Sequence, residues 1–565
     1  MAKTKKYEET PSEITSKVLK KESEFNDRNT RMDDDFDIWD MQETSATINY
    51  GNDGKKSAVS STLRENDIHV ISNEPRTFAD QVHSTLSDAE MQIMVRMVEN
   101  KGEDKRDDIA SLERLLHYAF DMADRRLRKM LLPPLRESII WDSIIRGWAA
   151  ASVLVYKAKD RNVIFDIQRL DPRWLTYEVG GDGMLWSGYK TFRSGAALKD
   201  EWGYEAKQKT DNMVINYWRH DGDNKFANAV ICGSDFVKEP TVYEMRSFPV
   251  TVVPVATRPP VSNETETQVA GYGESIFAPL REINKTRNRF ATIAATHANL
   301  LAKQPVINYY DEVGQQIKTT VYLAEGVLNL PKDHNKLEAA PMKELAPTVM
   351  QILNWLNDQM ERASLPHIPV GTPAPSGTLY NLVQEAGNKV FNPQLKNLTY
   401  FYQEVCRQIE EQLVDSNIEV DVKYEEKKKY FETQVTPIDL KKPHITRVEF
   451  TARTPWTQMD TYQIADMAKR LGLPDAFIHE YILKLPDPKG VGDLSAIEMA
   501  EHSPKMAMVR AIRSLMVAGR QDEAEAVMRD LYAMEASEMG QAQQPQLQSP
   551  GQAQQETPVG GTQIV

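Results

Sequence analysis

A long helical segment in the middle of the chain sets the first limit on its fold. The stretch GYGESIFAPLREINKTRNRF, residues 271–290, begins as a glycine-containing turn and continues with helical periodicity until Pro305, whose ring would end a helix. We predict one helix over residues 274–303. It collects several cations, although the chain has a formal net charge of −14. Why an acidic chain gathers so many cations on one helix is therefore the first question about this protein.

The cations of the predicted helix, except Arg287, share one face. At 100° per residue they fall within about 80° of Arg281, together with threonines and an asparagine. This polar stripe consists of Arg281, Lys285, Arg289, Thr292, Thr296, Asn299 and Lys303. The opposite, apolar stripe consists of Ile276, Ile283, Phe290, Ala294, Ala298 and Leu301. We expect the apolar stripe to pack on neighbouring elements, with Arg287 as an exception that pairs across an interface; a merely solvated amphipathic helix is the alternative.

Length and composition limit the class of protein. A chain of 565 residues is too long for one hydrophobic core, so about two to four packed regions are expected. Cys232 and Cys406 are too far apart for a disulfide framework or a multi-thiolate metal site, which indicates folding in a reducing compartment. No apolar run is long enough for a membrane span, and no secretion signal is expected. A pI near 5.4 argues against broad binding of nucleic acid.

The first 75 residues are polar and offer little that could be buried, which predicts a partly disordered N-terminal arm. Its acidic run RMDDDFDIWD, residues 31–40, lacks the glycine and the distal glutamate of a calcium-binding EF-hand loop. We interpret this run as a solvated group of charges and assign no metal to it.

Residues 76–273 read as a mixed α+β region. Helices are predicted over 87–102, 107–131 and 134–150 from caps and apolar spacing. Alternating apolar residues around the turns at 158–162 and 180–183 then predict antiparallel strands that continue to about 257.

The second half of the chain alternates between helices and short β segments. A small β module is predicted between 304 and 346, and Pro347 begins a helix with Val349, Ile352, Leu353, Leu356 and Met360 on one face. The Pro/Gly-rich loop 365–377 separates it from a helix over 377–414 that Pro393 should kink. Strands follow over 418–454 and helices over 458–536; the Gln/Pro-rich residues 537–565 read as a disordered tail.

A search for catalytic patterns is negative. The chain has no GxxxxGK[ST] phosphate loop, GxGxxG, HExxH, GxSxG or paired CxxC. His297, His367 and His479 are isolated and expected to be structural or exposed, and Glu410 and Glu411 are expected on a solvated helix face. We therefore assign no catalytic, cofactor-binding or metal-binding residue and expect no enzyme.

The layout from 271 to 414 resembles the portal protein of tailed double-stranded DNA bacteriophages. The resemblance rests on the G-x-S helix entry, the Lys-Gln-Pro exit, the β insert, the second helix, the Pro/Gly loop and SGTLYNLVQEAGNKVFNPQLKNL from residue 376. As a similarity of order and short patterns, it extends over roughly 80–530. It implies a mixed α+β, mainly helical portal fold with wing, stem, clip and crown regions, and a homododecameric ring around a central channel.

The resemblance also divides the chain into regions. These are the arm 1–75, the wing 76–273, stem helix 1 at 274–303, the clip 304–346, stem helix 2 at 347–364, the channel (tunnel) loop 365–377, the kinked wing helix and wing strands 378–455, the helical crown 456–536 and the tail 537–565. It implies DNA-channel residues Arg281, Lys285, Arg289 and Lys303. The channel-loop candidates are Pro366, His367, Pro369, Gly371, Pro373, Pro375 and Gly377, and the helix kink is Pro393.

A portal would form the conduit for packaging and ejecting double-stranded DNA at one capsid vertex. Its implied partners are the terminase large subunit, the major capsid and scaffolding proteins, and then head-tail adaptor or tail proteins, with no membrane and no cofactor. Its place would be the virion, and the host cytoplasm during assembly. Two other classes stay open: a cytosolic hydrolase or transferase with a diffuse active site, and a scaffold or adaptor protein that forms no ring.

Overall fold

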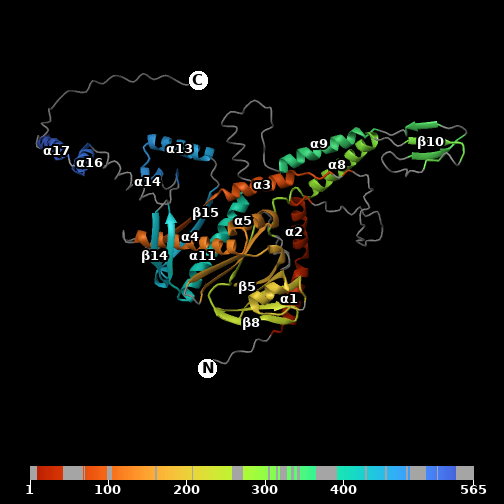
Figure 1. The fold of residues 1–565 in the computed structure, drawn as a ribbon, viewed down its shortest axis with the longest axis horizontal. Helices are drawn as coiled ribbons and strands as arrows, with labels where there is room; N and C mark the ends of the chain where they lie inside the picture. Colours follow the sequence, from red (N-terminus) through yellow and green to blue (C-terminus); the bar gives the residue numbers. More distant parts are fainter. Residues whose placement is uncertain are drawn as a thin grey trace, which may run out of the picture. The chain divides into compact units, whose positions relative to one another are not determined.

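The computed structural model of the protein describes residues 9–41, 68, 70–97, 105–158, 162–206, 208–256, 272–302, 306–312, 316–317, 327–332, 336–339, 344–363, 391–426, 429–451, 455–478, 482–483, 504–517 and 520–541. Its chain contains two compact units, Met1–Thr454 and Pro455–Val565 (Figure 1). The described part contains both helices and strands, with more helix than strand, and its sheets are open. The predicted mixed α+β class is therefore confirmed.

The N-terminal region forms two ordered helices, α1 (Pro11–Glu24) and α2 (Asn26–Trp39). Thr10 and Glu13 form a reciprocal capping box that begins α1. The prediction that this region has little to bury is wrong, because Ile14 and Val18 on α1 and Phe25, between the two helices, are all buried. A spacing of three to four residues places these side chains on one face, although polar residues separate them in the sequence.

The next two elements are α3 (Glu74–Ser87) and strand β1 (Glu90–Met97). Here the predicted helix 87–102 is wrong. Met91, Ile93, Val95 and Met97 stand at every second position and therefore share one face of a strand, with Gln92, Met94 and Arg96 on the other. β1 pairs antiparallel with β15 (His444–Thr451), with Ile93 opposite Val448.

Two helices and a π-helical turn follow: α4 (Lys105–Lys129), α5 (Leu135–Trp141) and η1 (Asp142–Arg146). Gly147 ends this stretch with a left-handed φ of 73°, and strand β2 begins at Trp148, so the helix predicted for 134–150 is shorter than expected. A Cβ atom on Gly147 would lie 2.4 Å from the backbone carbon of Glu274. This glycine therefore permits close packing against the segment that leads into the cationic helix.

Two antiparallel sheets form the centre of the first unit. One has the order β3-β2-β9, with β2 (Trp148–Lys157), β3 (Val163–Arg169) and β9 (Val250–Pro254). The other is a five-stranded meander of β4 (Leu175–Gly180), β5 (Gly183–Arg193), β6 (Asn212–His220), β7 (Lys225–Cys232) and β8 (Asp235–Glu244). The short helices η2 (Pro172–Trp174) and α6 (Gly195–Trp202) lie in the connections. The predicted hairpins around 158–162 and 180–183 are confirmed.

Helix α11 (Asn392–Asp415) packs on β2 and β9 and supplies hydrogen bonds to the end of β2. The side-chain amide of Gln412 accepts from the backbone N–H of Val155 and donates to the carbonyl of Val153, both at 2.8 Å. Pro393 stands in the first turn of α11 and not inside a helix, where its missing N–H costs no hydrogen bond. The preceding residues 364–390, which include the predicted channel loop 365–377, lie outside the described residues.

The cationic segment forms α8 (Arg281–Ala302), which lies beside α9 (Pro347–Ala363) (Figure 1). α8 begins later than the predicted residue 274, because Phe277 and Leu280 are buried in a preceding turn. Between the two helices, β10 (Val306–Tyr310), β11 (Val327–Pro331) and β12 (Lys336–Ala339) form a three-stranded sheet of order β11-β10-β12. The predicted β module and the helix beginning at Pro347 are confirmed.

The remaining elements of the first unit are β13 (Val420–Glu426), its antiparallel partner β14 (Lys429–Val435) and α12 (Pro437–Leu440). The second unit is helical where it is described, as predicted, with α13 (Pro455–Arg470), α14 (Asp475–Phe477), α16 (Pro504–Val517) and α17 (Gln521–Gln541). α17 continues past residue 537, where the tail was predicted to begin. The rest of that tail lies outside the described residues.

Candidate functional site: the cationic helix and its acidic cover

The first cation of α8 pairs with the acidic run 31–40, which was predicted from the sequence to be solvated. Arg281 donates from Nε to Asp35 Oδ1 at 2.6 Å and from Nη2 to Asp35 Oδ2 at 2.7 Å. Asp35 lies on α2 and is only 1% exposed. Glu274 adds a second acceptor, at 2.8 Å from Nη2. This is a bidentate, charge-assisted pair inside the protein, which is the strong form of an arginine–carboxylate contact.

Burial and pairing act against each other on this pair. Burial raises the pKa of Asp35, and the hydrogen bond from Arg281 only partly opposes that rise. Burial also acts to lower the pKa of Arg281, but the hydrogen bonds and charge of Asp35 outweigh it and raise that pKa. Each of the two residues therefore stabilises the charged form of the other inside the fold.

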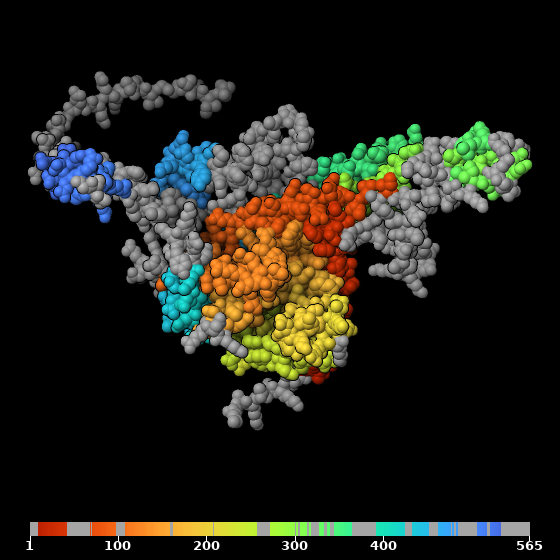
Figure 2. Space-filling view, viewed as in Figure 1, coloured from red at the N-terminus to blue at the C-terminus, as the bar shows by residue number. Residues whose placement is uncertain are grey.

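Neighbouring aspartates of α2 bind cations from other elements. Asp34 accepts from Lys285 Nζ at 3.1 Å, and Asp33 accepts from Arg173 Nε at 2.8 Å. The prediction that residues 31–40 form a solvated group of charges is therefore wrong: three consecutive carboxylates connect α2 to α8 and to the segment before β4. Figure 2 shows α2, in red, on the surface of the body beside the orange and yellow segments that follow it in the chain.

The segment RLDPRWL, residues 169–175, continues this ionic network. Arg169 pairs through two nitrogens with Asp142, whose burial raises the pKa of its carboxyl to about 7 against the opposing effect of the arginine. Asp171 accepts from the backbone N–H of Arg173 at 3.0 Å and lies 3.4 Å from Nε of Arg146. Ion pairs between arginines and aspartates thus run without a break from η1 to α2.

The threonines of the polar stripe bind the backbone of the N-terminal region. Thr292 and Thr296 each accept at 3.1 Å, from the N–H groups of Val70 and Ile68 respectively. Asn288 accepts from Ser72 in the same way. Two residues of extended chain span about 6.6 Å and four residues of helix about 6 Å, so every second N–H meets an acceptor one helical turn further along. Ile68, Val70 and Ser72 therefore lie one after another along α8.

The other basic residues of α8 differ in their surroundings. Arg287 donates to Asn357 of α9 at 2.6 Å and to Glu74 of α3 at 2.9 Å, so it pairs within the chain. Arg289 is exposed, and Lys303 lies outside the described residues. Of the four proposed channel residues, the structure thus brings Arg281 and Lys285 against α2 and leaves Arg289 accessible.

The residues considered for catalysis do not assemble with this network. Contrary to the prediction from the sequence, Glu410 does not lie on a solvated face: it accepts from Thr446 at 2.8 Å and lies 3.3 Å from Nε2 of partly buried His444. Hydrogen bonding to Glu410 raises the pKa of His444. Cys232 and Cys406 are buried free thiols. Among the described residues, no group of three or more His, Cys, Asp or Glu side chains is arranged to hold a metal ion.

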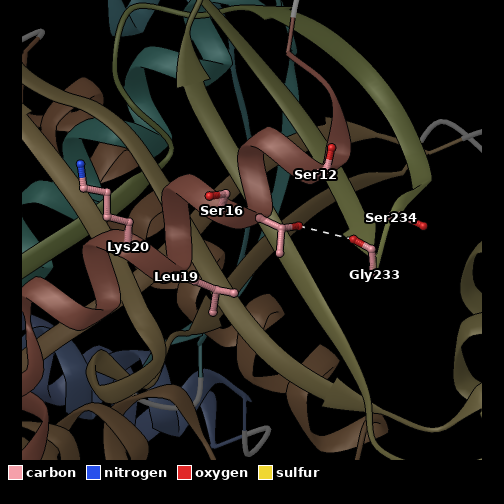
Figure 3. A pocket seen from close by; sticks show the side chains of 7 residues that line it. Ser12, Ser16, Leu19, Lys20, Gly233 and Ser234 are labelled. Carbon is pink, nitrogen blue, oxygen red and sulfur yellow. Dashed lines mark hydrogen bonds between the residues drawn. The ribbon is translucent and has the colours of Figure 1, made fainter.

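A shallow depression lies between α1 and the turn from β7 to β8 (Figure 3). It is lined on α1 by Ser12, Thr15, Ser16, Leu19 and Lys20 and on the turn by Gly233 and Ser234. Thr15 donates to the carbonyl of Gly233 at 3.5 Å.

The aspartates that pair with the cationic helix are visible in the sequence, but no sequence pattern indicates that they pair with it. The aspartates at 33–35 are the densest acidic run before α8, yet Asp35 and Arg281 are 246 positions apart. None of the helices in the described ranges is long and apolar enough to cross a membrane. No protein-family model matches this chain, and no curated protein matches it in sequence.

Proposed function

We propose that this protein is a portal-type subunit that assembles into a ring at one capsid vertex. In this role the ring conducts double-stranded DNA during packaging and ejection, and it docks first the terminase motor and then the tail. The observation that carries the proposal is the order of the middle of the chain: helix α8, the three-stranded module of β10, β11 and β12, and helix α9 lying back along α8. A mixed α+β body precedes this helix hairpin, which consists of α8 and α9, and strands and α11 follow it.

Exposed apolar side chains on this hairpin support assembly. Ile293 of α8 and Met350 of α9 are exposed, and Trp355 of α9 is 58% exposed. Large apolar groups that stand outside a subunit are typical of surfaces that a partner covers. In a ring, copies of the same chain would cover these apolar side chains through one repeated interface that closes by rotation.

The charges of α8 suit guidance of DNA and not tight binding. Arg281 and Lys285 are neutralised by α2, whereas Arg289 is exposed. A ring of chains that each carry −14 repels phosphate over most of its surface. Exposed arginines at one level of the channel would add weak, salt-screened contacts to DNA in transit.

The test compares two exposed aromatic positions. Trp355→Glu places a charge on the proposed subunit contact, whereas Tyr400→Glu changes a residue of α11 with a similar exposure, 61%. Negative-stain electron microscopy of the purified full chains should show rings for the parent and for Tyr400→Glu but few for Trp355→Glu. Rings that are equally abundant in all three samples would remove the helix hairpin from the interface. The absence of rings from the parent would refute the proposed function.

A further inference from the structure

The connection between α4 and α5 presents an apolar tip to solvent. Six consecutive residues, 128–133, are exposed, and they include Met130, Leu131 and Leu132. Leu131 is 93% exposed. Pro133 and Pro134 follow directly and restrict the backbone. The tip, defined as residues 128–133, therefore presents its leucines on a restricted backbone, and no residue that the structure describes buries them.

The backbone of the tip is strained by the residue at its centre. The N–H of Leu132 donates to the carbonyl of Leu127 at 3.0 Å and that of Leu131 to Arg128 at 3.1 Å, which is the pattern that closes a helix with a left-handed residue. Leu131 holds that position with φ of 58°. Glycine is the common residue there, because a Cβ atom is unfavourable in this conformation. A leucine at this point therefore lowers the stability of the subunit. A contact with another molecule would explain why a leucine stands there.

Charge narrows the choice of partner. Arg128 and Lys129 are exposed beside the leucines, in the last turn of α4. The tip is therefore apolar and basic, whereas the whole chain is acidic at −14. A basic tip is attracted to an acidic protein and, within this chain's own assembly, to a second copy.

The exposed end of α2 has the complementary character. Phe36 and Met41 are exposed there, and Asp37 lies between them. Burial first, and then the charges of Asp34, Asp33 and Asp40, raise the pKa of Asp37. This end of α2, defined as residues 36–41, thus combines apolar side chains with carboxylates.

We propose that the apolar, basic tip 128–133 of one copy docks on the apolar, acidic end 36–41 of α2 in a second copy. The two surfaces differ, so the contact is head-to-tail, and head-to-tail contacts generate rings when their rotation closes. The inference deepens the proposed function and rests on it: it names surfaces through which neighbouring subunits recognise one another. Leucines would supply the buried area, and Lys129 would face Asp37.

Mutants of the full chain separate this contact from folding. Leu131→Asp should weaken self-association about tenfold, measured by mass photometry over a dilution series, without lowering the thermal midpoint. Ile438→Asp is the matched control, because Ile438 is also exposed, at 73%, and lies near lysines. Lys129→Asp and Asp37→Lys should each weaken association, and the two together should restore it. Single variants without effect, or a pair without rescue, would overturn the proposed contact.

Photocrosslinking identifies directly the surface that contacts the tip. Both native cysteines are buried, so Leu131→Cys adds an exposed thiol that takes a benzophenone maleimide. Illumination of mixed ¹⁵N-labelled and unlabelled chains should give crosslinks between copies that map to 36–41. Crosslinks to another surface, or tip-dependent binding to phosphatidylglycerol vesicles in place of crosslinks, would overturn the proposal. If the parent chain forms rings and these crosslinks are absent, only this inference fails; if it forms none, the proposed function fails as well.

Discussion

Arg281 and Asp35 meet in a bidentate ion pair although they are 246 residues apart in the chain. The pair joins α8 to an N-terminal helix and keeps both charges inside the protein. It also explains why an acidic chain can place several cations on one helix: the acidic run of α2 neutralises the first two of them.

Removing one partner should cost more than the pair contributes to stability. Asp35→Ala leaves the guanidinium of Arg281 buried without its main acceptor, and we expect a loss of about 3 kcal/mol in the free energy of unfolding. Thr30→Ala changes an exposed residue of the same helix and should stay within about 0.5 kcal/mol of the parent. Urea titration monitored by tryptophan fluorescence measures both. Equal stabilities would show that the pair is replaceable by water.

The pair of His444 and Glu410 predicts a pH dependence. Because the folded pKa of His444 is raised, its contribution to stability is complete below the unfolded pKa and is lost as pH rises through the folded pKa. Glu410→Gln removes this contribution. The difference in melting temperature between parent and variant should therefore be larger near about pH 5.5 than near about pH 8.5. A difference that is the same at both pH values would contradict this assignment.

Gly147 should tolerate no side chain. Gly147→Ala adds a Cβ atom 2.4 Å from the backbone of Glu274 and also strains a φ of 73°, so we expect a loss of about 3 kcal/mol or more. Gly203 has a similar φ of 69° but open space around it. Gly203→Ala isolates the backbone term, at about 1 kcal/mol. Chemical denaturation of the two variants gives the comparison, and equal losses would mean that the contact at residue 147 relaxes freely.

Leu131 should oppose the stability of the subunit. Leu131→Gly relieves the left-handed strain and should raise the free energy of unfolding by about 1 kcal/mol. Leu132→Gly, next to it but without that strain, should lower stability by about 0.5 kcal/mol, because glycine gains freedom in the unfolded chain. Thermal unfolding under conditions that keep the chain dissociated checks both signs. A loss in Leu131→Gly would show that the leucine is held by contacts within its own copy.

The module of β10, β11 and β12 should be separable from the body. Deleting 308–340 removes most of this small sheet, and the proposed function predicts a folded subunit that no longer binds the terminase motor. Removal of residues 542–565 is the matched control and should preserve both folding and motor binding. Circular dichroism and co-sedimentation with the motor measure the two properties. Motor binding that survives the first deletion would place the docking surface elsewhere.

Local patterns in the sequence predicted the parts of the fold that depend on local signals. The hairpins around 158–162 and 180–183 have strong turn residues and alternating strands, and α9 has a clear apolar face. β1 was mistaken for a helix because Ser87 and Gly102 resemble helix caps, while its real partner, β15, lies at 444–451. Such pairing over hundreds of residues is decided by tertiary contacts, which no local period reveals.

The candidate site failed to emerge from the sequence for the same reason. The stripe of α8 was predicted from helical geometry, but its partners were not, because a run of aspartates is equally compatible with solvent and with a buried ion pair. Only the fold brings Asp34 and Asp35 to Lys285 and Arg281. Thr292 and Thr296 could be placed on the polar face, but not against the N–H groups of Ile68 and Val70.

Native mass spectrometry of the purified chain measures directly whether copies of this protein close into a ring. One subunit has a mass of 64.3 kDa. A closed ring should appear as a discrete assembly of about twelve copies that persists on dilution, with a central hole in electron micrographs of the same sample. A chain that remains monomeric or dimeric under every assembly condition would contradict ring closure.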